Sequence, residues 1–135
     1  QYRSAGTASL YVKEKNMKNR ELIENYNRLF NLQREETEYH EKTGKQLLGG
    51  RVKVMYAVKK NMTEFLKKLE PYHEARAELL KSYENDETNE EFAAKQEELL
   101  NIDVEDVNIH KIDYMLLDGL ELSSIDLGAF MCMID

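Results

Sequence analysis

The sequence predicts an α+β fold that is mainly α: a long antiparallel helical hairpin over residues 17–83, then a short acidic helix, a small β element and a C-terminal helix over residues 84–135. Three observations support this order. Apolar residues recur at helical spacing in the first part, proline occurs once in 135 residues, and apolar and polar residues alternate after Val104. Because 41% of the residues are apolar and 33% are charged, we expect one globular domain over residues 17–135.

Residues 1–16 differ from the rest, because they begin with Ser, Gly and Thr and show no apolar periodicity. We expect either a flexible arm or a translated leader, in which case the native protein starts at Met17. The second hypothesis comes from residues 13–17, which can be encoded by AAG GAG AAA AAT ATG, a bacterial ribosome-binding site followed by a start codon. The codons for residues 13 and 14 test it.

The first helix is expected to begin near Met17 or Asn19 and to end near His40. Glycines at positions 44, 49 and 50 then indicate a loop before the second helix. The apolar residues of the first helix recur at helical spacing, which predicts a face that packs against the second helix. They are Leu22, Ile23, Tyr26, Leu29 and Phe30.

The second helix, from Arg51 to Tyr83, carries the clearest pattern in the chain. Two mostly apolar rows repeat every seven positions and alternate by three and four, which places both rows on one stripe of the helix. Pro71 lies within this stretch, but the spacing passes through it unshifted, so we expect one kinked helix rather than two. The stripe, a candidate seam for a partner or an oligomer, comprises Met55, Val58, Met62, Phe65, Leu69, Tyr72, Arg76, Leu79 and Tyr83.

This stripe has to be covered. We expect the first helix to cover part of it and a second copy to cover the rest, which predicts a homo-oligomer, most simply a dimer. Arg76 interrupts the apolar row. It marks the point where the seam opens, or it pairs with an acid such as Glu24 or Glu98. The simplest interpretation is an arginine that reaches solvent at the edge of the hairpin, and the functional one is a residue that specifies register or partner.

The acidic helix has a clear start signal. Thr88 and Glu91 match a capping box, in which each side chain binds the backbone of the other residue. We therefore expect a helix from Thr88 to about Leu100, with Phe92, Gln96 and Leu99 on one side.

The last part of the chain changes period. Residues 107–111 alternate as in a strand, and Asp118-Gly119 indicates a tight hairpin between two short apolar runs. Ser123 is the expected cap of a final helix. The apolar face of that helix comprises Ile125, Leu127, Phe130, Met131 and Ile134.

Charge is distributed unevenly along the chain. Residues 1–83 carry 17 basic and 11 acidic side chains, whereas residues 84–106 carry 1 and 10, and the whole chain has a net charge of −7. Either the acidic segment folds back on the basic helices, or it presents a contact surface to a basic partner. That acidic surface comprises Asp86, Glu87, Glu90, Glu91, Glu97 and Glu98. A basic flank on the second helix, able to follow phosphates, comprises Lys53, Lys60 and Lys67.

The sequence contains no motif for catalysis, a metal or a cofactor, so we expect none of the three. His40, His73 and His110 lie far apart, and no zinc, calcium, phosphate-loop or nucleophile-elbow pattern occurs. Cys132 is the one cysteine, which excludes an internal disulfide and fits a reducing cytoplasm. The longest apolar run, residues 129–134, is too short to span a bilayer, so we expect no membrane association through a spanning helix.

Short motifs occur along most of residues 17–135: Tyr56-Ala57-Val58-Lys59-Lys60-Asn61, Leu69-x-x-Tyr72-x-x-x-Arg76-x-x-Leu79, Val107-Asn108-Ile109 and Leu122-Ser123-x-x-Asp126-Leu127. In these motifs the chain resembles a family of small uncharacterised proteins encoded by phages and prophages of Gram-positive bacteria. The resemblance implies a location in the cytoplasm of a bacterial host. It assigns no catalytic residue, because the family has no established activity.

Together these observations predict a phage or prophage accessory protein that acts by protein–protein contact without catalysis. A second hypothesis is an early phage inhibitor of a host defence factor, whose acidic surface imitates nucleic acid. Neighbouring genes separate these two, because virion genes favour the first and early regulatory genes the second. A third hypothesis is nucleic-acid binding through the lysine flank, which predicts salt-sensitive DNA retention that is lost when Lys60 and Lys67 are changed to Glu.

Overall fold

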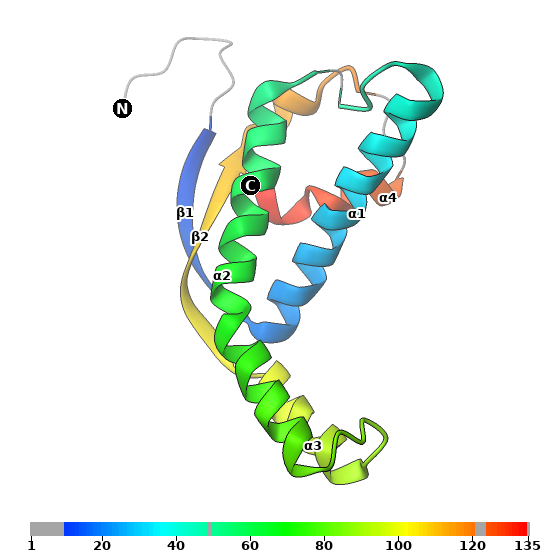
Figure 1. Ribbon diagram of the computed structural model, residues 1–135. Helices are drawn as coiled ribbons and strands as arrows, with labels where there is room; N and C mark the ends of the chain where they lie inside the picture. The colour runs from blue at the N-terminus through cyan, green and yellow to red at the C-terminus, as the bar shows by residue number, and fades with distance from the viewer. Residues whose placement is uncertain (1–9, 49, 121–123, 135) are drawn as a thin grey trace.

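The structure is a computed structural model that describes residues 10–48, 50–120 and 124–134. Its elements in chain order are β1 (Leu10–Lys18), α1 (Asn19–Thr43), α2 (Val52–Ser82), α3 (Glu90–Leu100), β2 (Asp103–Ile112), the 3-10 helix η1 (Tyr114–Leu117), α4 (Ser124–Ala129) and the 3-10 helix η2 (Met131–Met133). The two long helices run antiparallel, the two-stranded sheet lies along one side of α2, and α4 lies behind the hairpin (Figure 1). The predicted α+β, mainly α class is confirmed.

α1 begins and ends with recognisable capping chemistry. The Lys18 N–H donates to Glu21 Oε1 over 3.0 Å at the first turn. Gly44 has a φ of +72°, which glycine adopts without steric cost, and its N–H donates to the His40 carbonyl over 2.8 Å. The predicted first helix is therefore confirmed, with its end one turn beyond the expected position.

α2 continues through Pro71 as a single helix from Val52 to Ser82, as predicted. Pro71 lies on the exposed side of the helix, and so does Lys67, whose carbonyl loses its helical donor at the proline. Water can satisfy that carbonyl, so the proline interrupts one hydrogen bond without ending the helix.

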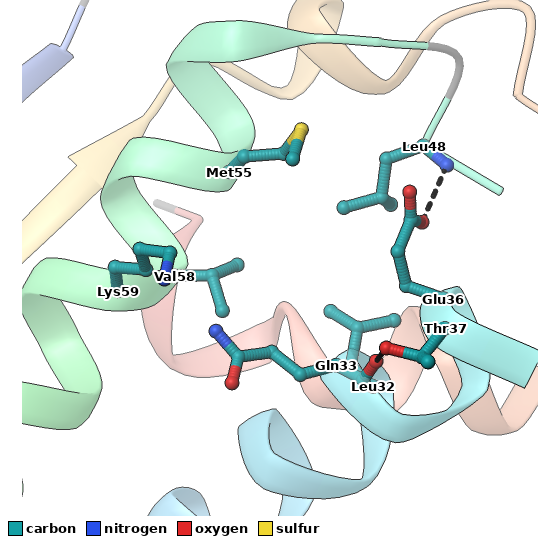
Figure 2. A pocket seen from close by; sticks show the side chains of 8 residues that line it. All are labelled: Leu32, Gln33, Glu36, Thr37, Leu48, Met55, Val58 and Lys59. Atoms are coloured by element: carbon teal, nitrogen blue, oxygen red, sulfur yellow. Dashed lines mark hydrogen bonds between the residues drawn. The ribbon is translucent and has the colours of Figure 1, made fainter. Parts of the chain in front are cut away.

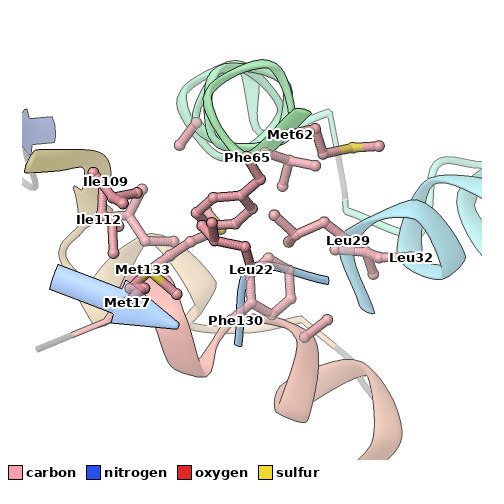
Figure 3. Close-up of a cluster of buried hydrophobic side chains, with 14 of the residues drawn as sticks. Met17, Leu22, Leu29, Leu32, Met62, Phe65, Ile109, Ile112, Phe130 and Met133 are labelled. Atoms are coloured by element: carbon pink, nitrogen blue, oxygen red, sulfur yellow. The ribbon is translucent and has the colours of Figure 1, made fainter. Parts of the chain in front are cut away.

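The core lies where α1, α2, β2 and the C-terminal segment, residues 124–134, meet (Figure 3). Phe65 of α2 points between Leu22 of α1 and Phe130, and all three side chains are fully buried. The stripe of α2 is thus covered within one chain as far as Tyr72, by the sheet and the C-terminal segment as well as by α1. The expectation that this stretch needs a second copy is wrong, because three elements rather than one pack on α2. The homo-oligomer itself stays a prediction.

β2 pairs antiparallel with β1, from Leu10 opposite Ile112 to Lys18 opposite Asp103, with an irregularity after Lys15. The expected flexible arm over residues 1–16 is therefore wrong for residues 10–16, which form a strand; residues 1–9 lie outside the described residues. From Tyr11 to Asn16 the side chains of β1 are exposed, so the strand lacks the apolar alternation that would have revealed it. The hypothesis of a start at Met17 concerns codons and stays a prediction.

The free edge of β2 is closed by two side chains of α2. Asn61 is fully buried, and its Nδ2 donates to the His110 carbonyl over 2.9 Å while its Oδ1 accepts the His110 N–H over 2.7 Å. One turn later, Glu64 Oε2 accepts the Asn108 N–H over 2.9 Å. These contacts satisfy backbone groups that would otherwise be left unpaired beside a helix, and they fix α2 to the sheet.

Two local predictions, the cap of α3 and the hairpin after β2, need correction. α3 is capped by Asn89, whose Oδ1 accepts the N–H groups of Glu91 and Phe92, whereas Thr88 binds Asp86 instead of forming a capping box. The expected hairpin at Asp118-Gly119 is wrong, because β2 ends at Ile112 and the residues before the turn form the 3-10 helix η1 instead of a strand.

The final helix is shorter than predicted. α4 ends at Ala129, and η2 follows after Phe130. Phe130 and Met133 are buried in the core, but Leu127 and Met131 are exposed, so the predicted apolar face is only partly correct. The expected cap, Ser123, lies outside the described residues.

Candidate protein-binding face between α1 and α2

The side of the hairpin that faces away from α4 carries apolar residues from both long helices. Gln33, Thr37, Met55 and Lys59 line one hollow between α1 and α2. Residues one and two turns away on the same helices lie on the same side, by helical spacing. We call this surface the α1–α2 face, and it comprises Tyr26, Phe30, Gln33 and Thr37 of α1 with Met55, Lys59, Met62 and Leu66 of α2.

Large apolar side chains on this face remain accessible. Phe30 is 51% exposed and Leu66 is 45% exposed, although Phe30 was expected to lie in the core. The rings of Tyr26 and Phe30 stack with their centroids 6.2 Å apart, which holds the Phe30 ring at the surface. Met62, one turn before Leu66 on α2, is almost fully buried. The face therefore has a buried apolar floor and exposed apolar side chains above it.

A hollow of about 260 Å³ lies at the end of this face nearest the loop between the helices. The side chains of Leu32, Leu48, Met55 and Val58 point toward one another across it (Figure 2). Glu36 Oε2 accepts the Leu48 N–H over 2.9 Å, which holds the loop against α1. The Glu36 carboxylate is thus committed to the backbone, and the hollow is mainly an apolar recess with Gln33 and Lys59 at its rim.

The predicted seam residues divide into two groups. Those from Val58 to Tyr72 belong to the core, and Met55 lines the hollow. Leu79 and Tyr83 are half-buried and lie toward α3, where the Tyr83 ring meets the Phe92 ring edge-on at 6.4 Å. Most of the predicted seam is therefore unavailable to a partner.

Arg76 holds α3 against α2. Its Nε donates to Gln96 Oε1 over 2.5 Å and its Nη2 to Glu87 Oε1 over 2.6 Å, while its guanidinium lies 5.4 Å from the Phe92 ring centroid. The expected partners Glu24 and Glu98 are wrong, because α3 returns along α2 and brings Glu87 and Gln96 closer. The role of Arg76 in this structure is to fix an intramolecular register.

The acidic and basic parts of the chain touch each other. Besides the Arg76–Glu87 pair, Arg20 of α1 forms an ion pair with Glu97 of α3. Asp86 accepts hydrogen bonds from the hydroxyl and the N–H of Thr88, and these bonds lower the pKa of its carboxyl. Half of the predicted acidic surface is thus occupied locally, and the exposed remainder is Glu90, Glu91 and Glu98.

The lysine flank lies on the solvent side of α2. Lys53, Lys60 and Lys67 are all exposed, and the Lys60 ammonium lies 6.0 Å from the centroid of the Tyr56 ring. Partial burial and then the charge of Lys60 lower the pKa of His110 on β2. Lys60 and Lys67 directly follow Lys59 and Leu66 of the α1–α2 face, so the flank lies about 100° around the helix from that face.

The cysteine and the candidate metal ligands can be placed in the described residues. Burial raises the pKa of the Cys132 thiol to about 11, with Lys111 opposing the shift, so the thiol is protonated and a poor nucleophile at neutral pH. Across residues 10–48, 50–120 and 124–134, no three His, Cys, Asp or Glu side chains come together as metal ligands would. In the same part of the chain, no helix has the length and apolar character needed to cross a membrane.

Known proteins do not assign the chain to a family. No protein-family model matches it, and neither a curated protein nor a solved structure is significantly similar to it. Its surface is therefore the remaining source of a functional proposal.

Leu66 is the apolar residue of this face that the sequence pattern did not single out. It lies outside the two heptad rows of α2, one turn after Met62. A signal was present, because Leu66 follows Met62 by four positions and so widens the apolar surface beyond the two rows. A stripe that wide predicts contacts on more than one side of the helix.

Proposed function

We propose that this chain is a non-catalytic protein-binding protein whose contact surface is the α1–α2 face. The observation that carries the proposal is the exposure of Phe30 and Leu66 over a buried apolar floor, beside an apolar recess. Contiguous exposed apolar side chains on a folded domain are typical of interaction sites, and aromatic residues are enriched there.

The shape of this face supports a protein partner over a small molecule. The hollow, at about 260 Å³, is smaller than the roughly 300–1,000 Å³ that ligand pockets have. Its carboxylate, Glu36, is already bound to the backbone, so few polar groups converge inside it. A groove between two antiparallel helices, with exposed apolar residues along it, fits a helix of another protein chain.

The biological setting that we propose is an accessory role for a phage or prophage in the cytoplasm of a bacterial host. This part rests on the resemblance of the motifs around Tyr56, Tyr72 and Val107 to phage-encoded proteins. In this setting the chain acts by binding another protein through the α1–α2 face.

The lysine flank favours a second candidate, nucleic-acid binding, because Lys53, Lys60 and Lys67 are exposed in a row along α2. It is the weaker candidate, since the chain as a whole is negative. Imitation of nucleic acid by the acidic segment is weaker still, because Glu87 and Glu97 already pair with arginines of the same chain. The chain bearing Lys60→Glu and Lys67→Glu separates nucleic-acid binding from the first candidate, because nucleic-acid binding is then lost whereas protein binding at the α1–α2 face is expected to be unchanged.

Affinity capture with matched variants tests the proposal. The chain with Phe30→Glu and Leu66→Glu places two charges on the face, and the control with Tyr114→Glu changes an aromatic residue on η1 that is 69% exposed. We expect the wild type and the control to retain the same protein from host cells and the double variant to lose it. Retention of that protein by the double variant contradicts the proposal.

A further inference from the structure

The outer edge of β1 is accessible to a further strand. In the part of the chain that the structure describes, β1 pairs with β2, and no other strand joins this sheet. Figure 1 shows β1 as the outermost element on its side of the molecule, with β2 between it and α2. The side chains from Tyr11 to Asn16 are exposed, so this stretch can be reached from both faces. An accessible strand edge is a template for pairing with another chain.

The contacts of β2 show which backbone groups of β1 point outward. Side chains of α2 bind the N–H and the carbonyl of His110 and the N–H of Asn108, so these groups point away from β1. Val12 lies opposite His110, and Glu14 lies opposite Asn108. Two opposite residues of an antiparallel ladder either bond to each other or both point away from each other. The N–H and carbonyl groups of Val12 and Glu14 therefore point toward the outer edge.

The side chains along this edge separate charge by face. Successive residues of a strand point to opposite faces, so Lys13 and Lys15 share one face, and Val12 and Glu14 share the other. All four side chains are exposed. One face of the edge is therefore basic, while the other combines an apolar residue with a single acid.

The acids of β2 lie on the inner side of β1, away from this edge. Directly opposite Lys15, β2 places the uncharged Val107. Glu105 and Asp106 follow at the irregularity of the ladder, where the Asp106 N–H donates to Asn16 Oδ1. The outer edge itself thus presents two lysines and one glutamate between Tyr11 and Asn16.

We propose that the outer edge of β1 binds an extended acidic segment of another protein as an added strand. The outward backbone groups of Val12 and Glu14 pair with the backbone of that segment. Acidic side chains at alternate positions of the segment lie across from Lys13 and Lys15, and an apolar side chain lies across from Val12. β1 contributes no residue to the α1–α2 face, so this is a second contact surface beyond the proposed function.

The same charges oppose a second copy of the chain as the occupant. Lysines on an edge strand disfavour pairing with an identical strand, because both strands carry the same charge. When Val12 lies opposite Glu14 of a second, antiparallel β1, Lys13 lies opposite Lys13 of the second copy, and like charges directly opposite are destabilising. An acidic segment places opposite charges at these positions instead.

A peptide titration followed by NMR tests the inference on the full chain. The probe is a capped peptide of about seven residues in which Glu alternates with Val and Thr. We expect it to shift the amide resonances of Val12 and Glu14 and to slow their hydrogen exchange about tenfold at saturation, because both N–H groups become hydrogen-bonded. The same peptide with Lys in place of Glu is expected to bind at least about tenfold more weakly.

Two pairs of variants separate the backbone from the charge. Val12→Pro removes an outward N–H and leaves the ladder to β2, so we expect it to abolish binding, whereas Val12→Thr keeps the N–H and the binding. Lys15→Glu is expected to weaken binding about tenfold. Lys42→Glu changes the net charge equally and leaves the affinity unchanged, because Lys42 is exposed about 35 Å along α1 from its first residue, beyond the Debye length.

Three results overturn the inference. The first is an acidic peptide that leaves the β1 resonances unchanged at about 1 mM. The second is equal binding of the acidic and the lysine peptide, or equal binding by the wild type and Lys15→Glu. The third is protection of the Val12 amide before any peptide is added, which would assign the edge to the chain itself or, if it rises with protein concentration, to a second copy. None of the three concerns the α1–α2 face, which the Phe30→Glu and Leu66→Glu variant tests separately.

Discussion

Asn61 and His110 exchange two hydrogen bonds, one from the amide of Asn61 to the His110 carbonyl and one from the His110 N–H back to Asn61 Oδ1, at 2.9 and 2.7 Å. A side chain of α2 thereby pairs with the backbone of β2 as a neighbouring strand would. This contact fixes one side of α2 to the sheet. Another side of α2 forms the α1–α2 face together with α1.

Replacing Asn61 with Leu is expected to destabilise the fold by about 3 kcal/mol, because it leaves the His110 N–H and carbonyl buried without partners. Urea denaturation measures the loss. Glu64→Gln is the control, since its amide oxygen can still accept the Asn108 N–H, and we expect a change below about 1 kcal/mol. A loss for Asn61→Leu as small as that of the control would show that the pair contributes little.

Removing residues 1–16 is expected to lower the free energy of unfolding by at least about 2 kcal/mol, because most of the ladder between β1 and β2 is lost. Thermal unfolding of the full chain and of the chain starting at Met17 gives the difference. Unchanged unfolding would show that β1 adds nothing to the fold, and would fit the hypothesis that translation starts at Met17.

Arg76→Ala is expected to detach α3 while leaving the rest of the fold intact. The variant loses the hydrogen bond to Gln96, the ion pair with Glu87 and the contact with the Phe92 ring. Because Glu87 is largely exposed, the ion pair itself adds little, and we expect a total loss of about 1–2 kcal/mol. Hydrogen exchange should accelerate in residues 90–100 and not in β2. Equal acceleration in both segments would contradict this assignment.

The thiol of Cys132 is expected to react slowly with Ellman's reagent in the native state. Burial raises its pKa from 9.0 to about 11, so the unfolded chain releases the proton first as the pH rises. The stability linked to this group is thus complete below about pH 9 and decreases toward pH 11. At pH 8 the difference of two pKa units lowers the thiolate fraction about 100-fold. We therefore expect the native thiol to react at least about 100-fold more slowly than the thiol in urea. Equal rates would place Cys132 at the surface.

Periodicity explains why the two long helices were predictable. Each buries one stripe continuously, so the spacing of Leu22 and Leu29 in α1, and of Phe65 and Tyr72 in α2, appears directly in the sequence. The same reasoning carried α2 correctly through Pro71, because the spacing on both sides of the proline stayed in phase.

The elements that the sequence did not reveal depend on contacts far along the chain. β1 has exposed side chains and pairs with β2 about 90 residues later, so neither its pattern nor its neighbours indicate a strand. The cap of α3 lies one residue later than predicted. Thr88 and Asn89 are both good caps, and only the geometry of the turn decides between them.

The candidate site was only partly predictable for a related reason. A heptad stripe shows which residues are apolar, but the number of elements that pack on the helix decides which of them stay exposed. The sheet and the C-terminal segment bury Phe65 and Leu69, which leaves Leu66, outside the stripe, at the surface. On α1, Phe30 stays exposed for the same reason, although its spacing matches that of a core residue.

Site-specific photo-crosslinking tests the protein-binding face most directly. A benzophenone amino acid in place of Leu66 reports any protein chain that lies on the face, whereas the same group in place of Tyr114 reports η1, which is also exposed. We predict a defined protein adduct from position 66, either with a second copy or with another protein, and none from position 114. The account is contradicted if position 66 yields no protein adduct, or if both positions yield the same one.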